Sequence, residues 1–454
     1  MSETATASIW DRQRLGVTLG AVALIFLAAI ESLAVTTVMP VVSVALDGEA
    51  LFAVAFAGTL ATSVIGMVAA GAWSDARGPR GALYVAVSLF LIGLVISGAA
   101  TDMYTFLLGR LVQGLGTGGQ TVALYVVVAR LYPPNLHGRV FAAFAAAWVV
   151  PSMIGPFLAG AVAEFLHWRW AFLGVAVLTA LAFATIALRL RGVDLGGGDG
   201  GGGSAVWRRL GLAVVVAAGA VTVGLTADFD DLRLGWLVAI GAIVVIGVAA
   251  RPLLPRGTLL ARRGLPSVVL MRGIVAGAFF AGEAYIPNLL MNRFDFTPTW
   301  AGIALMFAAL AWAGASAAQG RYGDRLGNTR IATIGITLVV SALLGVLLTA
   351  QFQLSPLVIV LGWGLGGGGM GLLYPRLTVL TLAYSDERNQ GFNSSALSIS
   401  DSGGSAVAIA LAGLAFATIG GGAAGYVGVF AFCIALLVVA VVPGRRLGHA
   451  AEQS

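Results

Sequence analysis

The chain alternates between long apolar runs and short breaks that carry charge, glycine or proline. Each run is long enough for a helix to cross a hydrocarbon core, which takes about 20 residues. Fourteen runs meet this condition. They predict spanning helices at 16–44, 51–73, 82–100, 104–131, 139–164, 169–188, 208–226, 234–250, 267–290, 299–319, 331–350, 355–383, 392–418 and 424–442.

Composition agrees with a chain dissolved in lipid. Apolar residues make up 59% of the sequence and charged residues only 10%, whereas about a quarter of an ordinary soluble domain is charged. The lipid bilayer is therefore the expected partner of most of the surface. In such a chain the net charge of +6 reports orientation rather than nucleic-acid binding. The first run, from Leu15 to Leu46, is longer than a signal-peptide core, so we expect it to remain as the first helix.

Arginine accounts for all 26 basic residues, and positive residues collect on the cytoplasmic side of membrane proteins. If both ends are inside, the cytoplasmic segments hold twenty arginines and only Arg169, Arg233 and Arg293 fall outside. This bias predicts cytoplasmic termini and requires an even number of spans, but it does not separate fourteen spans from twelve with a re-entrant pair at 208–250. The other three arginines lie within predicted helices: Arg110, Arg272 and Arg376.

A glycine-rich segment and an internal repeat divide the chain. The segment 192–204, GVDLGGGDGGGGS, has no apolar periodicity and predicts a flexible tether. The motif from Gly71 to Gly78 recurs about 250 residues later as Gly320 to Gly327, and two other glycine patterns recur at nearly the same shift. Duplication of this kind is typical of transporters. We predict a six-helix bundle at 1–191, a linker at 192–207, two inserted helices with their loops at 208–266 and a second six-helix bundle at 267–454.

Four motifs in order resemble the major facilitator superfamily, and within it the fourteen-helix drug/proton antiporters. They are GAWSDARGPRGAL at 71–83, RLVQG at 110–114, GPFLAG at 155–160 and ESLAVTTVMP at 31–40. Pro151 stands where the antiporter motif usually has glycine, and Glu31 stands where aspartate is commoner. The resemblance implies an all-α membrane protein with a major-facilitator-type fold, in which two six-helix bundles are joined by two further spanning helices.

Acidic residues inside predicted helices are the candidates for proton coupling, because intramembrane ionisable residues are costly unless they are functional or paired. Glu31 could load and release a proton, or be a protonated packing residue. The resemblance implies that its partner is Arg110, whose alternative is to extend toward the outer surface. Glu283 and Asp401 are further candidates for a second proton site or for binding a cationic substrate, and Arg376 could neutralise one of them. Asp401 lies in a segment, 398–404, that we expect to be a Ser/Gly-rich turn.

The resemblance also implies a gate around the junction of the second and third helices. There Asp75 could cap the third helix, and the arginines could pair with acids or lipid phosphate, although positive-side anchoring explains Arg80 alone. Glycine and proline in the fifth helix favour bending and close approach of a neighbour. The gating and motif residues are Gly71, Asp75, Arg77, Gly78, Arg80, Gln113, Pro151, Gly155, Pro156, Gly160 and Asp324.

Aromatic and amide residues on the central helices could line a cavity for flat lipophilic ligands, although each could instead face lipid or pack. These residues are Tyr125, Trp148, Phe280, Tyr285, Asn288 and Trp312. The histidines have no ligand spacing, so we expect no metal site and no cofactor other than the proton as coupling ion. No catalytic residues stand out.

The sequence thus predicts a monomeric, proton-coupled antiporter that exports lipophilic compounds from a bacterial inner membrane by alternating access. An exporter of a lipid or an endogenous metabolite is the alternative within transport. A membrane-embedded lipid-modifying enzyme is the alternative from another class.

Overall fold

The computed structural model describes residues 12–191, 193, 195, 203–385 and 390–448, and within them fourteen helices are long and apolar enough to span a membrane. The first half holds α1 (Arg12–Ala45), α2 (Phe52–Arg77), α3 (Pro79–Ala99), α4 (Met103–Leu131), α5 (Pro134–Phe165) and α6 (Trp170–Leu190). The inserted pair is α7 (Gly203–Leu225) and α8 (Leu232–Ala250). The second half holds α9 (Leu265–Phe294), α10 (Pro298–Leu326), α11 (Asn328–Phe352), α12 (Leu357–Ala383), α13 (Gln390–Thr418) and α14 (Gly422–Gly444).

Local chemistry determines where the helices begin and end more closely than hydropathy does. Pro134 and Pro298 occupy first-turn positions, where a missing N–H costs nothing, so α5 and α10 begin there. Asp102 caps α4: its carboxylate accepts hydrogen bonds from the backbone N–H and the hydroxyl of Thr105 at 2.9 and 2.7 Å. These hydrogen bonds hold the pKa of Asp102 below its ordinary value. Most of the predicted tether lies outside the described residues, and α7 begins five residues earlier than expected.

The two halves repeat one packing scheme. In the first half α4 lies against α2 and α3, and α1 lies against α5 and α6; in the second half α12 lies against α10 and α11, and α9 lies against α13 and α14. Gly78 and Gly327 end α2 and α10 with the same backbone conformation, φ 83° and ψ 158° against φ 78° and ψ 158°. A positive φ of this kind favours glycine. The repeat detected in the sequence is therefore a repeat of structure.

Close helix approaches explain one glycine in each half. A Cβ built on Gly118 of α4 would lie 1.9 Å from the carbonyl oxygen of Ser63 on α2. A Cβ built on Gly367 of α12 would lie 2.0 Å from the carbonyl oxygen of Ala308 on α10. No side chain fits at either place, so the backbones of the paired helices touch directly.

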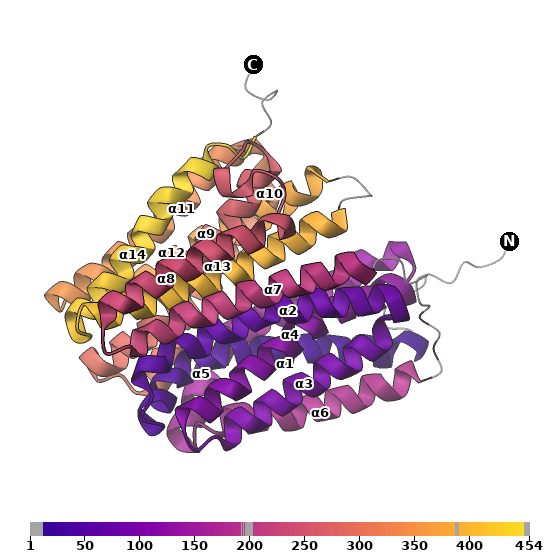
Figure 1. Ribbon diagram of the computed structural model, residues 1–454, viewed down its shortest axis with the longest axis horizontal. Helices are drawn as coiled ribbons and strands as arrows, with labels where there is room; N and C mark the ends of the chain where they lie inside the picture. The colour runs from indigo at the N-terminus through magenta and orange to yellow at the C-terminus, as the bar shows by residue number, and fades with distance from the viewer. Residues whose placement is uncertain (1–11, 192, 194, 196–202, 386–389, 449–454) are drawn as a thin grey trace.

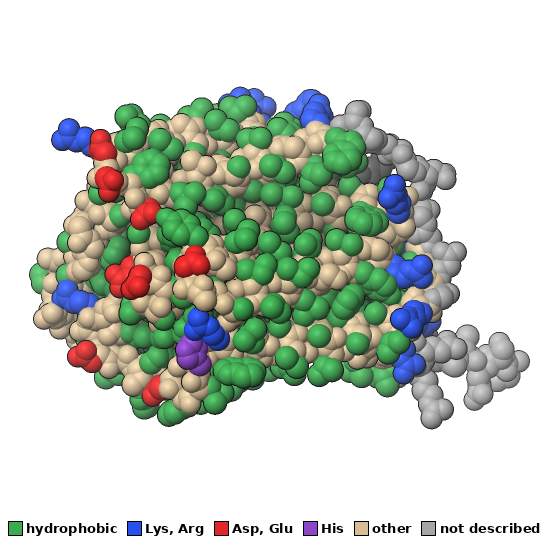
Figure 2. Space-filling view, turned by 60° about the horizontal axis from the view of Figure 1, so that its bottom comes forward, with side chains coloured by type: hydrophobic (Ala, Val, Ile, Leu, Met, Phe, Trp, Pro, Cys, Tyr) green, Lys and Arg blue, Asp and Glu red, His purple; other side chains and the backbone are tan. Residues whose placement is uncertain are grey.

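Figure 1 shows the two halves as separate bundles whose helices diverge toward the side on which α1 begins and α14 ends, here named the terminal side. The opposite side is named the distal side. Side chains on the visible face in Figure 2 are mostly apolar between the two ends, and acidic side chains gather at the left-hand end of the view. Such an apolar band is what a bilayer requires of its neighbours.

The inserted pair lies against both halves. α7 packs on α2 of the first half and on α13 of the second, and α8 packs mainly on α7. Four alanines meet where the three helices come together, each exposed by 2% or less: Ala61 on α2, Ala217 and Ala220 on α7, and Ala406 on α13. At the distal end, the indole of Trp236 on α8 donates to the hydroxyl of Thr418 on α13 at 3.0 Å.

Candidate transport site

The halves meet each other most closely near the distal side. A Cβ on Gly160 of α5 would lie 2.3 Å from the carbonyl oxygen of Pro298, and one on Gly302 of α10 would lie 2.1 Å from that of Pro156. Across the other seam, a Cβ on Gly413 of α13 would lie 2.4 Å from Cβ of Ala53 at the start of α2. These backbone contacts close the interface on the distal side.

Nearer the terminal side, the predicted gate residues are exposed. The side chains of Asp75, Arg77 and Arg80 are exposed, and Arg80 donates to the carbonyl oxygen of Leu190 at 3.5 Å. α3 is capped by Gly78 with no side-chain hydrogen bond, so Asp75 does not cap it. The side chain of Asp324 lies outside the described residues.

The first ion pair joins Glu31 of α1 to Arg110 of α4. The guanidinium donates to Oε1 of Glu31, to Oε1 of Gln113 at 2.8 Å and to the carbonyl oxygen of Ala55 on α2 at 3.3 Å. The side chains of Arg110 and Glu31 are exposed by only 4% and 3%. Arg110 therefore holds α1, α2 and α4 together in a sealed part of the first half, and it pairs with the acid that the motif resemblance implied.

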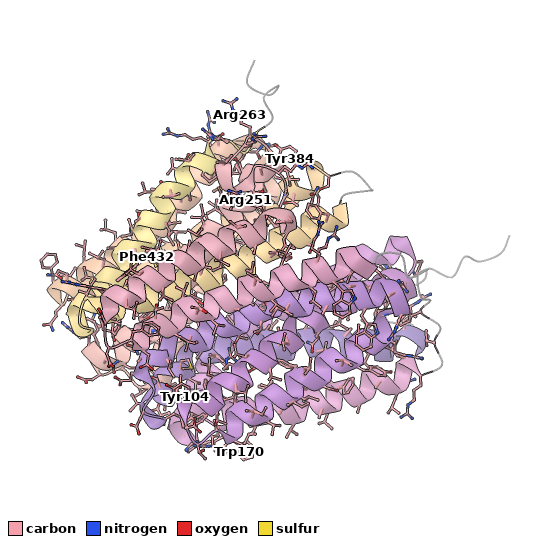
Figure 3. All side chains as sticks on the ribbon, viewed as in Figure 1. Tyr104, Trp170, Arg251, Arg263, Tyr384 and Phe432 are labelled. Carbon is pink, nitrogen blue, oxygen red and sulfur yellow. The ribbon has the colours of Figure 1, made fainter. Side chains whose placement is uncertain are left out.

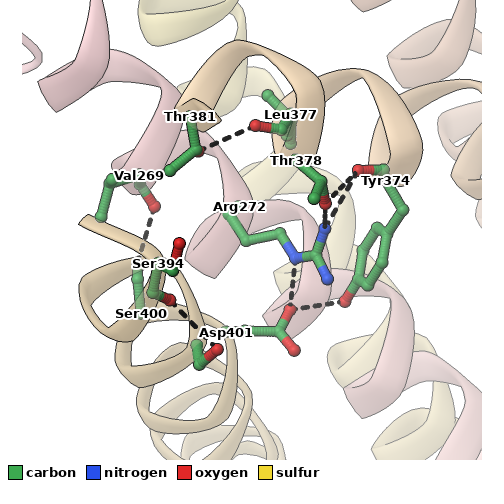
Figure 4. A network of polar contacts seen from close by, with 10 residues as sticks. Val269, Arg272, Tyr374, Leu377, Thr378, Thr381, Ser394, Ser400 and Asp401 are labelled. Atoms are coloured by element: carbon green, nitrogen blue, oxygen red, sulfur yellow. Dashed lines mark hydrogen bonds and ion pairs between the residues drawn. The ribbon is translucent and has the colours of Figure 1, made fainter. Parts of the chain in front are cut away.

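The second ion pair joins Arg272 of α9 to Asp401 of α13 (Figure 4). Nε of Arg272 donates to Oδ1 of Asp401 at 2.8 Å, and Nη1 donates to the carbonyl oxygen of Tyr374 on α12 at 3.1 Å. The hydroxyl of Tyr374 also donates to Asp401, at 2.7 Å, and the guanidinium carbon lies 3.4 Å from the centre of the Tyr374 ring. Here 13% of the Arg272 side chain and 27% of the Asp401 side chain are exposed.

Two expectations about this region need correction. Arg272, rather than Arg376, lies against Asp401, while Nε of Arg376 donates to Oδ1 of Asn328 at 2.7 Å. The segment 398–404 is not a turn: it lies inside α13, which is helical from Gln390 to Thr418. Helix geometry is what turns Asp401 toward α9 and α12.

Glu283 of α9 has a different environment from the two paired acids. The indole N–H of Trp363 donates to its Oε2 at 3.4 Å. Trp363 stacks on Phe279, with ring centres 4.8 Å apart, and Phe279 also meets Phe280 and Trp312 edge to face. No cation contacts Glu283 within hydrogen-bonding distance among the described residues. An ionised carboxylate is costly in such surroundings, so a proton or another cation would stabilise this site.

The predicted cavity residues fall into three groups. Tyr125 and Trp148 are exposed by 47% and 46%, and Tyr125 stacks on Phe144. Phe280 and Trp312 are partly buried in the aromatic cluster around Tyr374. Tyr285 and Asn288 contact side chains of other helices.

Tyr285 is only 3% exposed and packs against Phe52 across the seam between the halves. Asn288 accepts hydrogen bonds from Tyr426 and from Asn292. Both residues lie in α9 toward the distal side. Both therefore lie near the contacts that close that side.

Comparison with known proteins agrees with this architecture. A sequence profile of the Major Facilitator Superfamily matches residues 21–408. The chain belongs to this superfamily. The all-α fold and the fourteen candidate membrane spans among the described residues agree with this membership.

Relatives of this superfamily member are fungal and bacterial transporters. The acurin A biosynthesis cluster MFS-type transporter of Aspergillus aculeatus is 25% identical over 326 residues, which are 67% of this chain and 57% of that protein. The MFS efflux transporter aclA of Aspergillus oryzae is 33% identical over 148 residues, 32% of this chain and 27% of that protein. A third relative, MFS transporter L2 of a Phoma species, is covered over only 25% of its length. The chain thus spans about a quarter to somewhat over half of these three relatives.

Solved structures show the same fold at low sequence identity. A POT family transporter in complex with a thioalcohol-conjugated peptide superposes with a TM-score of 0.70 at 16% identity, covering 96% of each chain. A D-xylose–proton symporter superposes with a TM-score of 0.64 at 14% identity, covering 94% of this chain and 97% of that one. At these identities the likeness concerns the fold alone.

Proposed function

We propose that this transporter is a proton-coupled antiporter that exports lipophilic compounds from a bacterial inner membrane, as a monomer with both termini in the cytoplasm. The observation that carries the proposal is the presence of a carboxyl group in the membrane part of each half, Glu31 and Glu283. A relative named as an efflux transporter and the exposed aromatic residues Tyr125 and Trp148 support export of apolar compounds.

The contacts of Arg110 suggest how a proton on Glu31 is felt at the distal side. Protonation removes the counter-ion of Arg110 and leaves a cation sealed in the protein, which is costly. The remaining acceptors are Gln113 and Ala55, and Ala55 lies two residues from Ala53, which touches α13 of the other half. A shift of Arg110 therefore acts on the segment of α2 that closes the distal side.

Glu283 supplies a second proton-accepting group in the half that moves against the first. Glu283 is partly exposed, and its hydrogen-bond partner among the described residues, the indole of Trp363, is a neutral donor that leaves the carboxyl group without a counter-ion. A proton moving inward releases about 2.3 kcal/mol per 100 mV of membrane potential, in addition to any pH difference. That amount corresponds to roughly fifty-fold accumulation of a neutral substrate.

Transport by purified protein in proteoliposomes with an imposed pH gradient tests the proposal. The probe is the fluorescent lipophilic dye ethidium, and the variants are Glu31→Gln, Glu283→Gln and, as a matched control, Glu49→Gln, whose side chain is exposed. We expect each of the first two variants to lose at least tenfold in gradient-driven transport, and the control to keep it. If both keep gradient-driven transport at the unmodified rate, the proton-coupling assignment is wrong.

A further inference from the structure

The segment that joins α8 to α9 concentrates positive charge on the terminal side. Residues 251–264, RPLLPRGTLLARRG, contain four arginines and no acid. Two more arginines, Arg445 and Arg446, come directly after the last residue of α14. All six side chains are exposed: Arg251, Arg256, Arg262, Arg263, Arg445 and Arg446. We name these six residues the arginine cluster.

Backbone contacts bring the two parts of the arginine cluster together. The N–H of Gly264 donates to the carbonyl oxygen of Arg446 at 2.9 Å, and Nη1 of Arg446 donates to the carbonyl oxygen of Ala261 at 3.0 Å. Figure 3 places Arg251 and Arg263 near the same end of the second bundle. The end of α14 is thus fastened to the segment before α9, so that charges 180 residues apart in sequence share one surface.

Gly257 allows the side chain of Arg262 to cross the loop. Its φ is +87°, and a Cβ there would lie 2.4 Å from Cδ of Arg262. The N–H of Arg262 also donates to the carbonyl oxygen of Gly257 at 3.2 Å. The side chain of Arg262 therefore lies against Gly257, the residue after Arg256, and the segment 251–264 contains no acid that could neutralise these arginines.

Two leucines lie exposed within the same loop. Leu259 and Leu260, in the short 3-10 helix Thr258–Leu260, are exposed by 44% and 71%. Apolar side chains next to a group of arginines at a membrane surface are typical of contact with the boundary between headgroups and acyl chains. Exposure of two leucines to water alone would be unfavourable.

We propose that the arginine cluster binds the phosphate groups of anionic phospholipids in the leaflet on the terminal side, while Leu259 and Leu260 contact their acyl chains. A guanidinium matches a phosphate with two parallel hydrogen bonds, and several guanidinium groups together select an anionic surface. The bound lipid fastens the loop between α8 and α9 to α14. This inference does not depend on which compound the protein transports.

The test measures the thermal unfolding midpoint of the purified full-length protein in detergent with added phosphatidylglycerol or phosphatidylcholine. The loop variant is Arg256→Gln/Arg262→Gln/Arg445→Gln. The matched control, Arg191→Gln/Arg208→Gln/Arg209→Gln, removes the same charge from exposed positions elsewhere on the terminal side. A third variant with lysine at 256, 262 and 445 keeps the charge. We expect phosphatidylglycerol to raise the midpoint of the unmodified protein, and the loop variant to lose at least half of that increase.

The control and the lysine variant should keep most of the increase. An equal increase with phosphatidylcholine, an undiminished increase in the loop variant or an equal loss in the control would each overturn the proposal. An increase reproduced by soluble glycerol phosphate would also overturn it, because a free phosphate site needs no lipid. If the loop variant does not fold, the single variant Arg262→Gln takes its place, with an expected loss of about a third.

Discussion

The two halves of the molecule share a backbone plan but treat their ion pairs differently. Gly78 and Gly327 end corresponding helices with nearly identical dihedral angles. Arg110 and Glu31, in contrast, are sealed at 4% and 3% exposure, whereas Arg272 and Asp401 are exposed by 13% and 27%. Duplication has therefore kept the helix packing and not the charges.

This difference separates two uses of charge in one membrane protein. A sealed pair cannot change its charge without disturbing the structure around it, so it suits a group that links protonation to conformation. A partly exposed pair is not fully enclosed by protein, so its charges are less costly to separate than those of a sealed pair. The second half is also where an acid without a contacting cation, Glu283, lies among aromatic rings.

Substituting the arginine of each pair should show the largest contrast. Arg110→Met leaves Glu31 sealed without a counter-ion and should lower the free energy of unfolding by about 3–5 kcal/mol. Arg272→Met leaves Asp401 in contact with solvent and with the Tyr374 hydroxyl, so its effect should be smaller by at least half. Thermal unfolding of both purified variants provides the measurement.

The double variant Glu31→Met/Arg110→Met is the control for the first effect. It removes both charges and should recover most of the lost stability, because apolar replacements of a buried pair are often neutral. Equal destabilisation by Arg110→Met and Arg272→Met would show that the two pairs do not differ in the way their exposure indicates.

Substitution of a tightly packed glycine in each half should affect the two halves alike. Gly118→Ala and Gly367→Ala each place a methyl group about 2 Å from a carbonyl oxygen of the adjoining helix. We expect each to cost about 1–3 kcal/mol, because the paired helices must separate. Gly314→Ala on α10, where a Cβ meets nothing within 4 Å, is the control and should be nearly neutral. Denaturation midpoints that differ strongly between Gly118→Ala and Gly367→Ala would mean that the two halves, despite their shared backbone plan, do not tolerate an added methyl group equally.

A change confined to the second pair should have the smallest effect on stability. Tyr374→Phe removes the hydroxyl that donates to Asp401 at 2.7 Å and keeps the ring under Arg272. We expect a loss of about 0.5–1.5 kcal/mol, the usual range for one hydrogen bond. Raising the salt concentration should reduce the difference in free energy of unfolding between Tyr374→Phe and the unmodified protein. A loss as large as that of Arg110→Met would instead show that the pair of Arg272 and Asp401 is sealed.

Much of the fold could be predicted because it depends on patterns that lie along the chain. Apolar runs bounded by charge gave all fourteen helices, with ends displaced by a few residues where proline or a cap moved the first turn. The repeated glycines also predicted which helices correspond. The pairing of Glu31 with Arg110 followed from a motif resemblance rather than from spacing.

The second ion pair could not be predicted in the same way. Arg272 and Asp401 are 129 residues apart, and the repeat does not place an arginine and an acid at the matching positions of the first half. Arg272 was recognisable only as one of three arginines within apolar runs. Likewise, the contacts of Tyr285 and Asn288 depend on partners from other helices, Phe52 and Tyr426. Contacts between distant segments of this kind leave no periodic signal in the sequence.

The alanine contacts of α7 with α2 and α13 have a consequence for how fast the halves can exchange positions. Alanine has no side-chain rotamers, so helices that meet through alanines can slide past one another without repacking side chains. The activation barrier for such sliding then contains little from the inserted pair itself. A larger branched residue such as leucine at Ala217 or Ala406 would interlock with the neighbouring helix. It would slow the change between the two arrangements of the halves, even where it leaves the resting structure intact.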